Sequence, residues 1–134
     1  MTAYVGIDPT ASSLHVGHLL PFLALFWLTL SGHNAVALVG GSTASVGDPT
    51  GRLVSRAHQA KEQRESNARS MKAQLSMLSE RFVALAEKHG FSRQDMGTIS
   101  VLDNSQWLNK VSIMDFLSIL GSKLRMGALL SRDT

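Results

Sequence analysis

The sequence predicts an α/β fold in which a parallel sheet carries flanking helices. Three predicted strands, the apolar stretches at residues 4–7 and 35–39 and a third stretch at residues 98–102, alternate with two longer helical patterns. Short strands as apolar as the first two are typical of parallel sheets, because those strands are buried on both faces. A helix between two strands also supplies the crossover that parallel neighbours need. Loops rich in polar residues follow the first two strands, which is where ligands of open α/β sheets bind.

Length and composition fit one folded domain without disulfides. The chain has 134 residues, of which 44% are hydrophobic and 17% charged, so neither a disordered chain nor a coiled coil is expected. The absence of cysteine excludes a disulfide framework, a thiolate metal site and a cysteine nucleophile. The longest apolar run, residues 19–30, is shorter than the roughly 20 residues of a membrane span, and no membrane partner is expected.

The first connection, from Asp8 to His18, is the candidate ligand site. Pro9 ends the strand at residues 4–7, and a helical pattern begins near residue 16. Backbone N–H groups and the positive dipole end of a helix start favour a phosphate there. Gly6 lets a ligand approach the strand closely. This stretch therefore predicts a nucleotide site.

The helix expected over residues 16–31 is apolar on all sides, which predicts burial of most of its surface. Gly32 is expected to follow its last turn in the left-handed conformation. The strand at residues 35–39 then leads into a glycine-rich loop, residues 40–51, at the same edge of the sheet as the first connection. The two loops are expected to face one crevice, although the second matches neither a Walker A nor a G-x-G-x-x-G motif.

A long amphipathic helix is predicted between residues 58 and 89. Its apolar side chains recur in steps of three and four and are expected to pack in the core: Met71, Leu75, Leu78, Phe82 and Leu85. A basic cluster begins with the first Lys or Arg of the chain and runs into this helix: Arg52, Arg56, Lys61, Arg64, Arg69 and Lys72. The cluster can attract phosphates or nucleic acid, but with Glu62 and Glu65 among its members it also fits a solvated helix face.

Two short helices are predicted after the third strand. Asp103, Asn104 or Ser105 is expected to cap the first, around Trp107. Ser112 is expected to cap the second, whose inner face would carry Ile113, Phe116, Leu117 and Leu120.

His15 and His18 lie one turn apart where the first long helix begins, and three interpretations are open. The imidazoles can donate hydrogen bonds to phosphate oxygens on which charge develops in a transition state. They can instead cap the helix structurally, or bind a metal ion with Asp8 or Asp48. The metal interpretation is the least favoured, because zinc-binding pairs on helices usually lie four apart with a glutamate nearby. Asp8 is also placed to bind a hydroxyl or amino group, Thr10 to donate to a phosphate, and Asp48 to hold an ammonium group.

At these positions the sequence resembles the class I aminoacyl-tRNA synthetases, and among them the tyrosyl-tRNA synthetases. The segments that carry the resemblance are Tyr4-Val5-Gly6-Ile7-Asp8-Pro9-Thr10, Leu14-His15-Val16-Gly17-His18, Ala37-Leu38-Val39-Gly40-Gly41-Ser42-Thr43 and Val46-Gly47-Asp48-Pro49-Thr50-Gly51-Arg52. Weaker matches follow at Asn104-Ser105-Gln106-Trp107-Leu108 and Phe116-Leu117. Two further segments are most similar to fungal mitochondrial members: Lys88-His89-Gly90 and Leu129-Leu130-Ser131-Arg132-Asp133-Thr134. The resemblance implies a Rossmann-like nucleotide-binding domain.

The resemblance also implies a role for each matching residue. Three residues would be catalytic and stabilise the phosphate charge as the tyrosine carboxylate attacks the α-phosphorus of ATP: Thr10, His15 and His18. ATP, brought with Mg²⁺, would contact Asp8, Gly17, Arg52 and Arg56. The tyrosine substrate would be bound by Tyr4 at its phenolic hydroxyl, by Gly6, and by Asp48 at its amino group.

Several parts of that family's pattern have no match in this sequence: the lysine-rich second signature, the downstream tyrosine-binding residues and the anticodon-binding domains. Residues 1–134 are therefore expected to form part of a class I catalytic domain, cut at both ends and catalytically incomplete alone. The expected reaction of the full-length protein is activation of L-tyrosine with ATP to tyrosyl-adenylate, followed by transfer to tRNA(Tyr). The resemblance implies a homodimer and the mitochondrial matrix, or otherwise the cytoplasm.

Two alternatives to a working enzyme stay open on the sequence. Some fungal mitochondrial members of this family also bind group I introns, so the basic cluster can be the surface of an RNA-binding splicing module. The chain can also be an inactive fragment that exposes an unpaired sheet edge.

Overall fold

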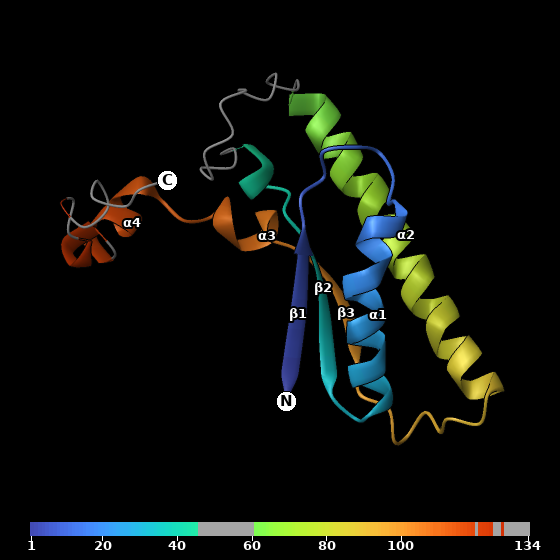
Figure 1. Ribbon diagram of the computed structural model, residues 1–134. Coiled ribbons are helices and arrows are strands. Elements are labelled where there is room, and N and C mark those ends of the chain that lie inside the picture. Colours follow the sequence, from blue (N-terminus) through green and yellow to red (C-terminus); the bar gives the residue numbers. More distant parts are fainter. Residues whose placement is uncertain (46–60, 120, 125–126, 128–134) are drawn as a thin grey trace.

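The computed structural model describes residues 1–45, 61–119, 121–124 and 127 (Figure 1). The larger elements are β1 (Thr2–Ile7), α1 (Val16–Leu30), β2 (Asn34–Val39), α2 (Lys61–Lys88) and β3 (Ile99–Asp103). Four short helical segments complete the described part: a 3₁₀ turn at Thr43–Ser45, α3 (Ser105–Leu108), α4 (Ile113–Ile119) and a 3₁₀ turn at Gly121–Lys123. In this part of the chain, no helix is long and apolar enough to cross a membrane.

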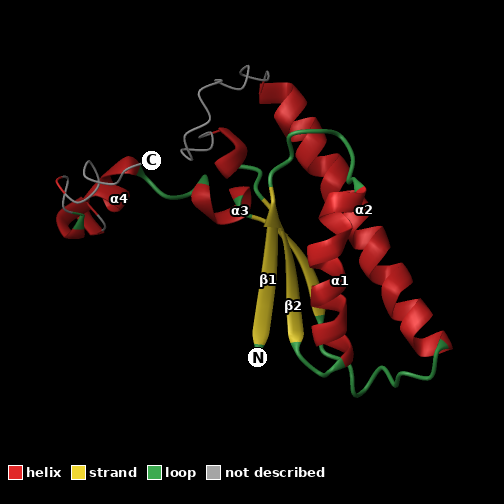
Figure 2. Ribbon diagram, in the orientation of Figure 1, coloured by secondary structure: helices red, strands yellow, loops and turns green. Residues whose placement is uncertain are grey.

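The three strands form a parallel sheet in the order β1-β2-β3, which confirms the predicted α/β class (Figure 2). Each strand lies within two residues of its predicted position. The register places Tyr4 beside Val36, and Gly6 beside Leu38. Because all strands run the same way, their carboxyl ends meet at one edge of the sheet.

Both long helices cover the same face of this sheet. The strands advance in one direction across the sheet, and right-handed crossovers then place both connecting helices on one side. Alternate strand residues pack there against the helices in one core: Ile7, Ala35, Ala37 and Val39 with Phe22, Leu25, Phe26, Ala68, Met71 and Leu75. The small alanines of β2 let the helices approach the sheet closely. The opposite face carries side chains that are half-buried or exposed: Tyr4, Val36, Leu38, Ser100 and Leu102.

The prediction that the first helix is buried on most sides is wrong. Phe22, Leu25 and Phe26 are buried, whereas Leu20 and Trp27 are 70% and 67% exposed. The reason is geometric, because a helix lying on a sheet with one other helix beside it contacts neighbours over only part of its circumference. Gly32 follows the helix with φ +79°, so the predicted left-handed residue is confirmed.

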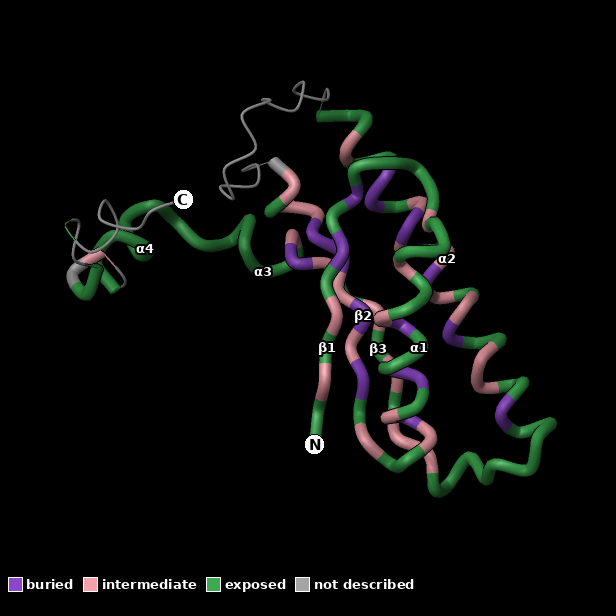
Figure 3. Tube along the Cα trace, in the orientation of Figure 1, coloured by how far each residue is buried: buried purple, intermediate pink, exposed green. Residues whose placement is uncertain are grey.

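The predicted apolar stripe of α2 is confirmed along most of its length. Met71 and Leu75 are buried, and Leu78 and Phe82 pack at the edge of the core. Phe82 stacks on Phe26 of α1 with ring centroids 4.1 Å apart, which joins the two helices. Leu85 departs from the prediction and is exposed, and Figure 3 shows that this end of α2 slants away from the sheet.

The inner face predicted for the helix after Ser112 is not buried. Ile113, Phe116 and Leu117 of α4 are all exposed, and Leu120 lies outside the described residues. The reason is that α4 lies away from the sheet and its two covering helices (Figure 1). The cap itself is confirmed, since Ser112 Oγ accepts a hydrogen bond from the Asp115 backbone N–H at 3.0 Å.

Candidate functional site

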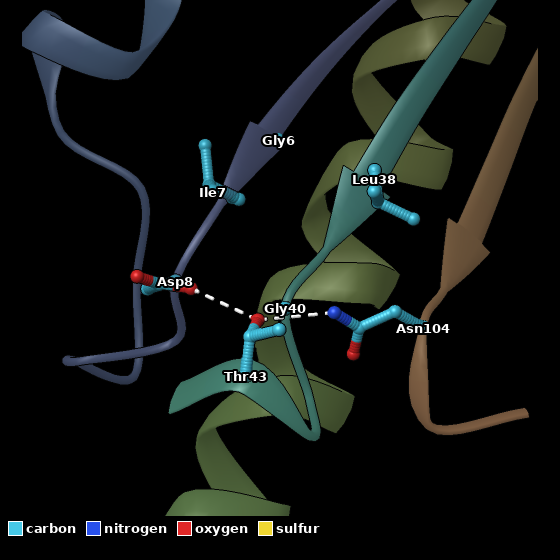
Figure 4. A pocket seen from close by; sticks show the side chains of 7 residues that line it. All are labelled: Gly6, Ile7, Asp8, Leu38, Gly40, Thr43 and Asn104. Carbon is cyan, nitrogen blue, oxygen red and sulfur yellow. Dashed lines mark hydrogen bonds between the residues drawn. The ribbon is translucent and has the colours of Figure 1, made fainter. Parts of the chain in front are cut away.

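The loops after the three strands meet at the carboxyl edge of the sheet around an open cavity of about 250 Å³ (Figure 4). The residues that line it belong to β1 and β2, to the positions directly after the three strands, and to the 3₁₀ turn at Thr43–Ser45: Gly6, Ile7, Asp8, Leu38, Gly40, Thr43 and Asn104. The strand ends are tied together by backbone bonds, Gly40 N–H to Ile7 O at 2.8 Å and Asn104 N–H to Val39 O at 3.0 Å. The single crevice predicted for the first two loops is present. A cavity of this size is smaller than a typical site of roughly 300–1,000 Å³ and accommodates part of a ligand.

A chain of polar contacts crosses this cavity. Asn104 Nδ2 donates to Thr43 Oγ1 at 3.0 Å, and Thr43 Oγ1 lies 3.4 Å from Asp8 Oδ1 as a long hydrogen bond. Asn104 Oδ1 in turn accepts from the Ser42 backbone N–H at 2.9 Å. Asn104 thus orients the Thr43 hydroxyl toward the Asp8 carboxylate, as Figure 4 shows.

Sequence reasoning assigned Asn104 only a possible helix cap and missed its place in the cavity. Asn104 does occupy the N-cap position of α3, but its side chain makes no capping hydrogen bond there. Asp103 supplies that bond instead, because its Oδ1 accepts from Ser105 N–H at 2.9 Å. The signal available in the sequence was a polar residue directly after a third parallel strand.

Two glycines make room for the acidic side chains at this edge. A Cβ at Gly40 would overlap Asp8 Oδ1, and a Cβ at Gly41 would overlap Asp103 Oδ1. Neither position has a positive φ, so what these sites require is space rather than an unusual backbone.

The histidines His15 and His18 form a capping box at the start of α1. His15 is the N-cap residue, and its Nδ1 accepts from the Gly17 backbone N–H at 3.2 Å. His18 Nδ1 accepts from the His15 backbone N–H at 3.3 Å. The two rings stack with centroids 3.7 Å apart. Of the interpretations left open by the sequence, structural capping is therefore confirmed.

This capping also fixes where each neutral imidazole carries its proton. A nitrogen that accepts a hydrogen bond holds no proton, so both rings carry theirs on Nε2 and can donate from that atom. Partial burial lowers the pKa of His18 below its usual 6.5, and the charge of His15 lowers it further. Capping and donation to a phosphate are thus compatible, because they use opposite nitrogens of each ring.

The remaining predicted site residues are distributed around this edge. Tyr4 and Gly6 lie on the face of the sheet that the helices leave open, with Tyr4 72% exposed and open space where a Gly6 Cβ would stand. Asp8 and Thr10 are exposed in the loop after β1. Gly17 lies against the His15 ring, since a Cβ there would stand 3.1 Å from it.

Three of the predicted site residues, Asp48, Arg52 and Arg56, lie outside the described residues. Their proposed contacts with the amino group of tyrosine and with ATP therefore stay predictions. Within the described ranges, no group of three His, Cys, Asp or Glu side chains is arranged to hold a metal ion.

Comparison with known proteins places this site in a family. The family model described as class I tRNA synthetases for tryptophan and tyrosine matches residues 1–134. The mitochondrial tyrosine–tRNA ligases of Podospora anserina and Homo sapiens are 43% and 47% identical to this chain, over 98% and 99% of its length. The crystal structure of a C-terminally truncated mitochondrial tyrosyl-tRNA synthetase from Aspergillus nidulans superimposes with a TM-score of 0.88 over 98% of the chain, at 42% identity.

The chain spans only part of these relatives. It covers 21% of the Podospora anserina protein, 27% of the Homo sapiens protein and 37% of the Aspergillus nidulans structure. The matched part of the structure includes all three strands and both long helices, so the fold is that of a partial Rossmann-like synthetase domain.

Proposed function

Because the chain belongs to the family of class I tRNA synthetases for tryptophan and tyrosine, we propose that it forms the nucleotide-binding part of a tyrosine–tRNA ligase. The proposed reaction of the whole protein is formation of tyrosyl-adenylate from L-tyrosine and ATP, followed by transfer of tyrosine to tRNA(Tyr). The proposed domain assignment is that residues 1–134 are a part of the catalytic domain. The named relatives are all tyrosine enzymes, which favours tyrosine over tryptophan.

One observation carries this proposal most directly: the His15–His18 cap and the cavity both lie at the carboxyl edge of the parallel sheet. The Nε2 protons of both rings and the start of α1 supply donors and positive potential for the phosphates of ATP. As the tyrosine carboxylate attacks the α-phosphorus, negative charge grows on the phosphate oxygens and pyrophosphate leaves. Donors already held by the cap stabilise that charge without having to reorganise.

Thr10 is proposed as a third donor to the phosphates, through its hydroxyl. Its backbone N–H donates to Asp8 O at 2.8 Å, which turns the loop after β1 back on itself. Asp8 is proposed to contact ATP from the same turn, and Gly17 to let the adenosine approach the helix start. Arg52 and Arg56 are proposed to reach the departing pyrophosphate.

The tyrosine substrate is proposed to lie on the open face of the sheet. Tyr4 would bind its phenolic hydroxyl, Gly6 would admit its ring close to β1, and Asp48 would hold its ammonium group. The exposure of Tyr4 and the open space at Gly6 support this placement, since a ligand there would displace no side chain of the described residues.

ATP is expected to enter with Mg²⁺ as part of the substrate. The residues at the cavity fit such a ligand, because Asp8 offers a carboxylate and Thr43 a hydroxyl, while phosphates and water commonly complete magnesium coordination. The charge of Mg²⁺ would offset part of the negative charge of the ATP phosphates.

Tyrosine-dependent exchange of pyrophosphate into ATP tests this function. The assay uses a chimera in which these 134 residues replace the matching segment of the human mitochondrial relative. Replacing His15→Ala and His18→Ala together is expected to reduce the exchange rate by at least about a hundredfold while tyrosine still binds, because phosphate stabilisation is lost. Full exchange activity in this double variant would contradict the proposed role.

Two controls sharpen this test. His33→Ala with His89→Ala removes the same number of imidazoles, one in the turn before β2 and one after the end of α2, and is expected to leave exchange unchanged. Tryptophan in place of tyrosine is expected to support no exchange, and exchange with tryptophan alone would reassign the substrate.

RNA binding is a second candidate function, favoured by basic residues on α2. Arg69 is exposed there, and Arg64 and Lys72 are half-buried on the same 28-residue helix. Group I intron RNA is the proposed partner, beside tRNA(Tyr).

Two further properties of the full-length protein are proposed. It is proposed to form a homodimer, and its proposed location is the mitochondrial matrix, which the mitochondrial relatives favour.

A further inference from the structure

The loop between β1 and α1, residues 8–15, is fastened to α2 by two side chains far away in the sequence. In Figure 1 this loop crosses α2, and the hydrogen bonds establish that the two are in contact. Gln74 and Asn67 of α2 provide the contacts. They are seven residues apart, so they lie two turns apart on one side of the helix.

Gln74 bonds the loop backbone with both ends of its amide. Its Oε1 accepts from the Leu14 N–H at 3.0 Å, and its Nε2 donates to Ser12 O at 3.0 Å. The same Nε2 also donates to Ser70 Oγ at 3.2 Å on the preceding turn of α2, which orients the amide. The loop is thereby held at two of the three residues that precede the His15 N-cap, Ser12 and Leu14.

Asn67 holds the other end of the loop. Its side chain is 2% exposed, and Nδ2 donates to Pro9 O at 3.3 Å while Oδ1 accepts from Gln63 Nε2 at 2.9 Å. Pro9 itself is buried. Asn67 therefore fixes the place where the chain leaves β1, and its burial makes its replacement costly for folding as a whole.

We propose that Gln74 is a positioning residue for adenylate formation, which holds the His15–His18 cap in place at the carboxyl edge of the sheet by clamping the Ser12 and Leu14 backbone. This inference rests on the proposed function. Gln74 touches neither imidazole, and it acts through the backbone that sets the position of His15. Gln74 is half-buried whereas Asn67 is buried, so a substitution at Gln74 tests the loop contacts without opening a cavity in the core.

Two variants separate the contacts that Gln74 makes, and a third serves as a control. Gln74→Met keeps the length of the side chain and removes both bonds to the loop. Gln74→Glu keeps an acceptor for the Leu14 N–H but cannot donate to Ser12 O. Gln94→Met makes the same change of side chain at an exposed position between α2 and β3, and serves as the matched control.

Amide hydrogen exchange in the 134-residue chain tests the clamp itself. Gln74→Met is expected to speed exchange of the Leu14 and Gly17 N–H groups by about tenfold, the second because the His15 cap loosens. Gln74→Glu is expected to keep the Leu14 N–H protected, and Gln94→Met to change neither amide. Unchanged exchange at Leu14 and Gly17 in Gln74→Met would overturn the proposal.

Pyrophosphate exchange in the chimera tests the consequence for catalysis. Gln74→Met is expected to lower kcat by about ten- to a hundredfold and to leave the KM for tyrosine within about twofold, because a misplaced cap affects phosphate chemistry and not the sheet face. A raised KM with unchanged kcat would overturn the positioning role. If the wild-type chimera forms no adenylate, the proposed function fails, and amide exchange at Leu14 and Gly17 alone then decides whether Gln74 holds the cap.

Discussion

At the scale of single residues, His15 and His18 cap α1 with one ring nitrogen each and leave the other for the proposed donation to phosphate. Each Nδ1 accepts a backbone hydrogen bond at the start of α1, and each Nε2 is left as the protonated nitrogen. A histidine pair at a helix start therefore does not force a choice between a structural and a functional interpretation. The sequence left the two as alternatives because spacing alone does not say which nitrogen faces the helix.

The lowered pKa of His18 predicts a pH dependence of stability. Its folded-state pKa lies below the 6.5 of the unfolded chain, so the unfolded state binds more protons as the pH falls past 6.5. Protonation also removes the Nδ1 acceptor from the cap. The free energy of unfolding is therefore expected to be highest above pH 6.5 and to fall below it, as measured by urea denaturation over a pH series.

A substitution at the same position assigns this dependence to His18. His18→Asn retains an acceptor oxygen without titrating and is expected to flatten the slope of stability against pH just below 6.5. His33→Asn at the other end of α1 is expected to keep that slope. An unchanged slope in His18→Asn would contradict the assignment.

At the scale of elements, α1 shows that an apolar sequence does not determine burial. The helix is hydrophobic on all sides, yet only the face toward β1, β2 and α2 is covered. The neighbours that are present decide which leucines are buried. Two leucines two residues apart illustrate this, Leu23 at 50% exposed and Leu25 at 3%.

These two leucines predict unequal effects of the same substitution. Leu25→Ala is expected to lower the free energy of unfolding by about 2–5 kcal/mol, because it removes buried methyl groups and leaves a cavity. Leu23→Ala, at an exposed position, is expected to change it by no more than about 0.5 kcal/mol. Urea denaturation of both variants measures the difference, and equal losses would mean that Leu23 is also buried in solution.

At the scale of the whole molecule, chemistry and charge occupy different parts. The cavity and the His15–His18 cap lie at the carboxyl edge of the sheet, and most of the described Lys and Arg residues lie along α2. Lys61 already pairs with Glu65 at 3.9 Å, and both side chains are more than half exposed. Such an exposed pair contributes little to stability, so we expect the charges on α2 to affect mainly the binding of partners.

Neutralising α2 tests whether this charge binds RNA. Replacing Arg64→Gln, Arg69→Gln and Lys72→Gln together in the chimera is expected to weaken binding of group I intron RNA. The slope of log affinity against log salt concentration is expected to become less steep, by the amount that corresponds to losing up to about three phosphate contacts. Pyrophosphate exchange is expected to persist, because these residues lie outside the cavity lining. Unchanged RNA affinity and salt slope would remove the RNA-binding candidate.

Local patterns in the sequence suffice to predict the three strands, the helices between them and the position of the first two loops at one edge of the sheet. These features follow from local periodicity and chain direction, which nearby residues encode. The tertiary structure alone decided that Asn104 faces the cavity, that Gln74 clamps the loop before His15, and that one side of α1 stays exposed. Each of these features depends on how the elements pack against one another. Gln74 accepts a hydrogen bond from the Leu14 N–H, which lies 60 residues away in the sequence, and no local pattern encodes such a pairing.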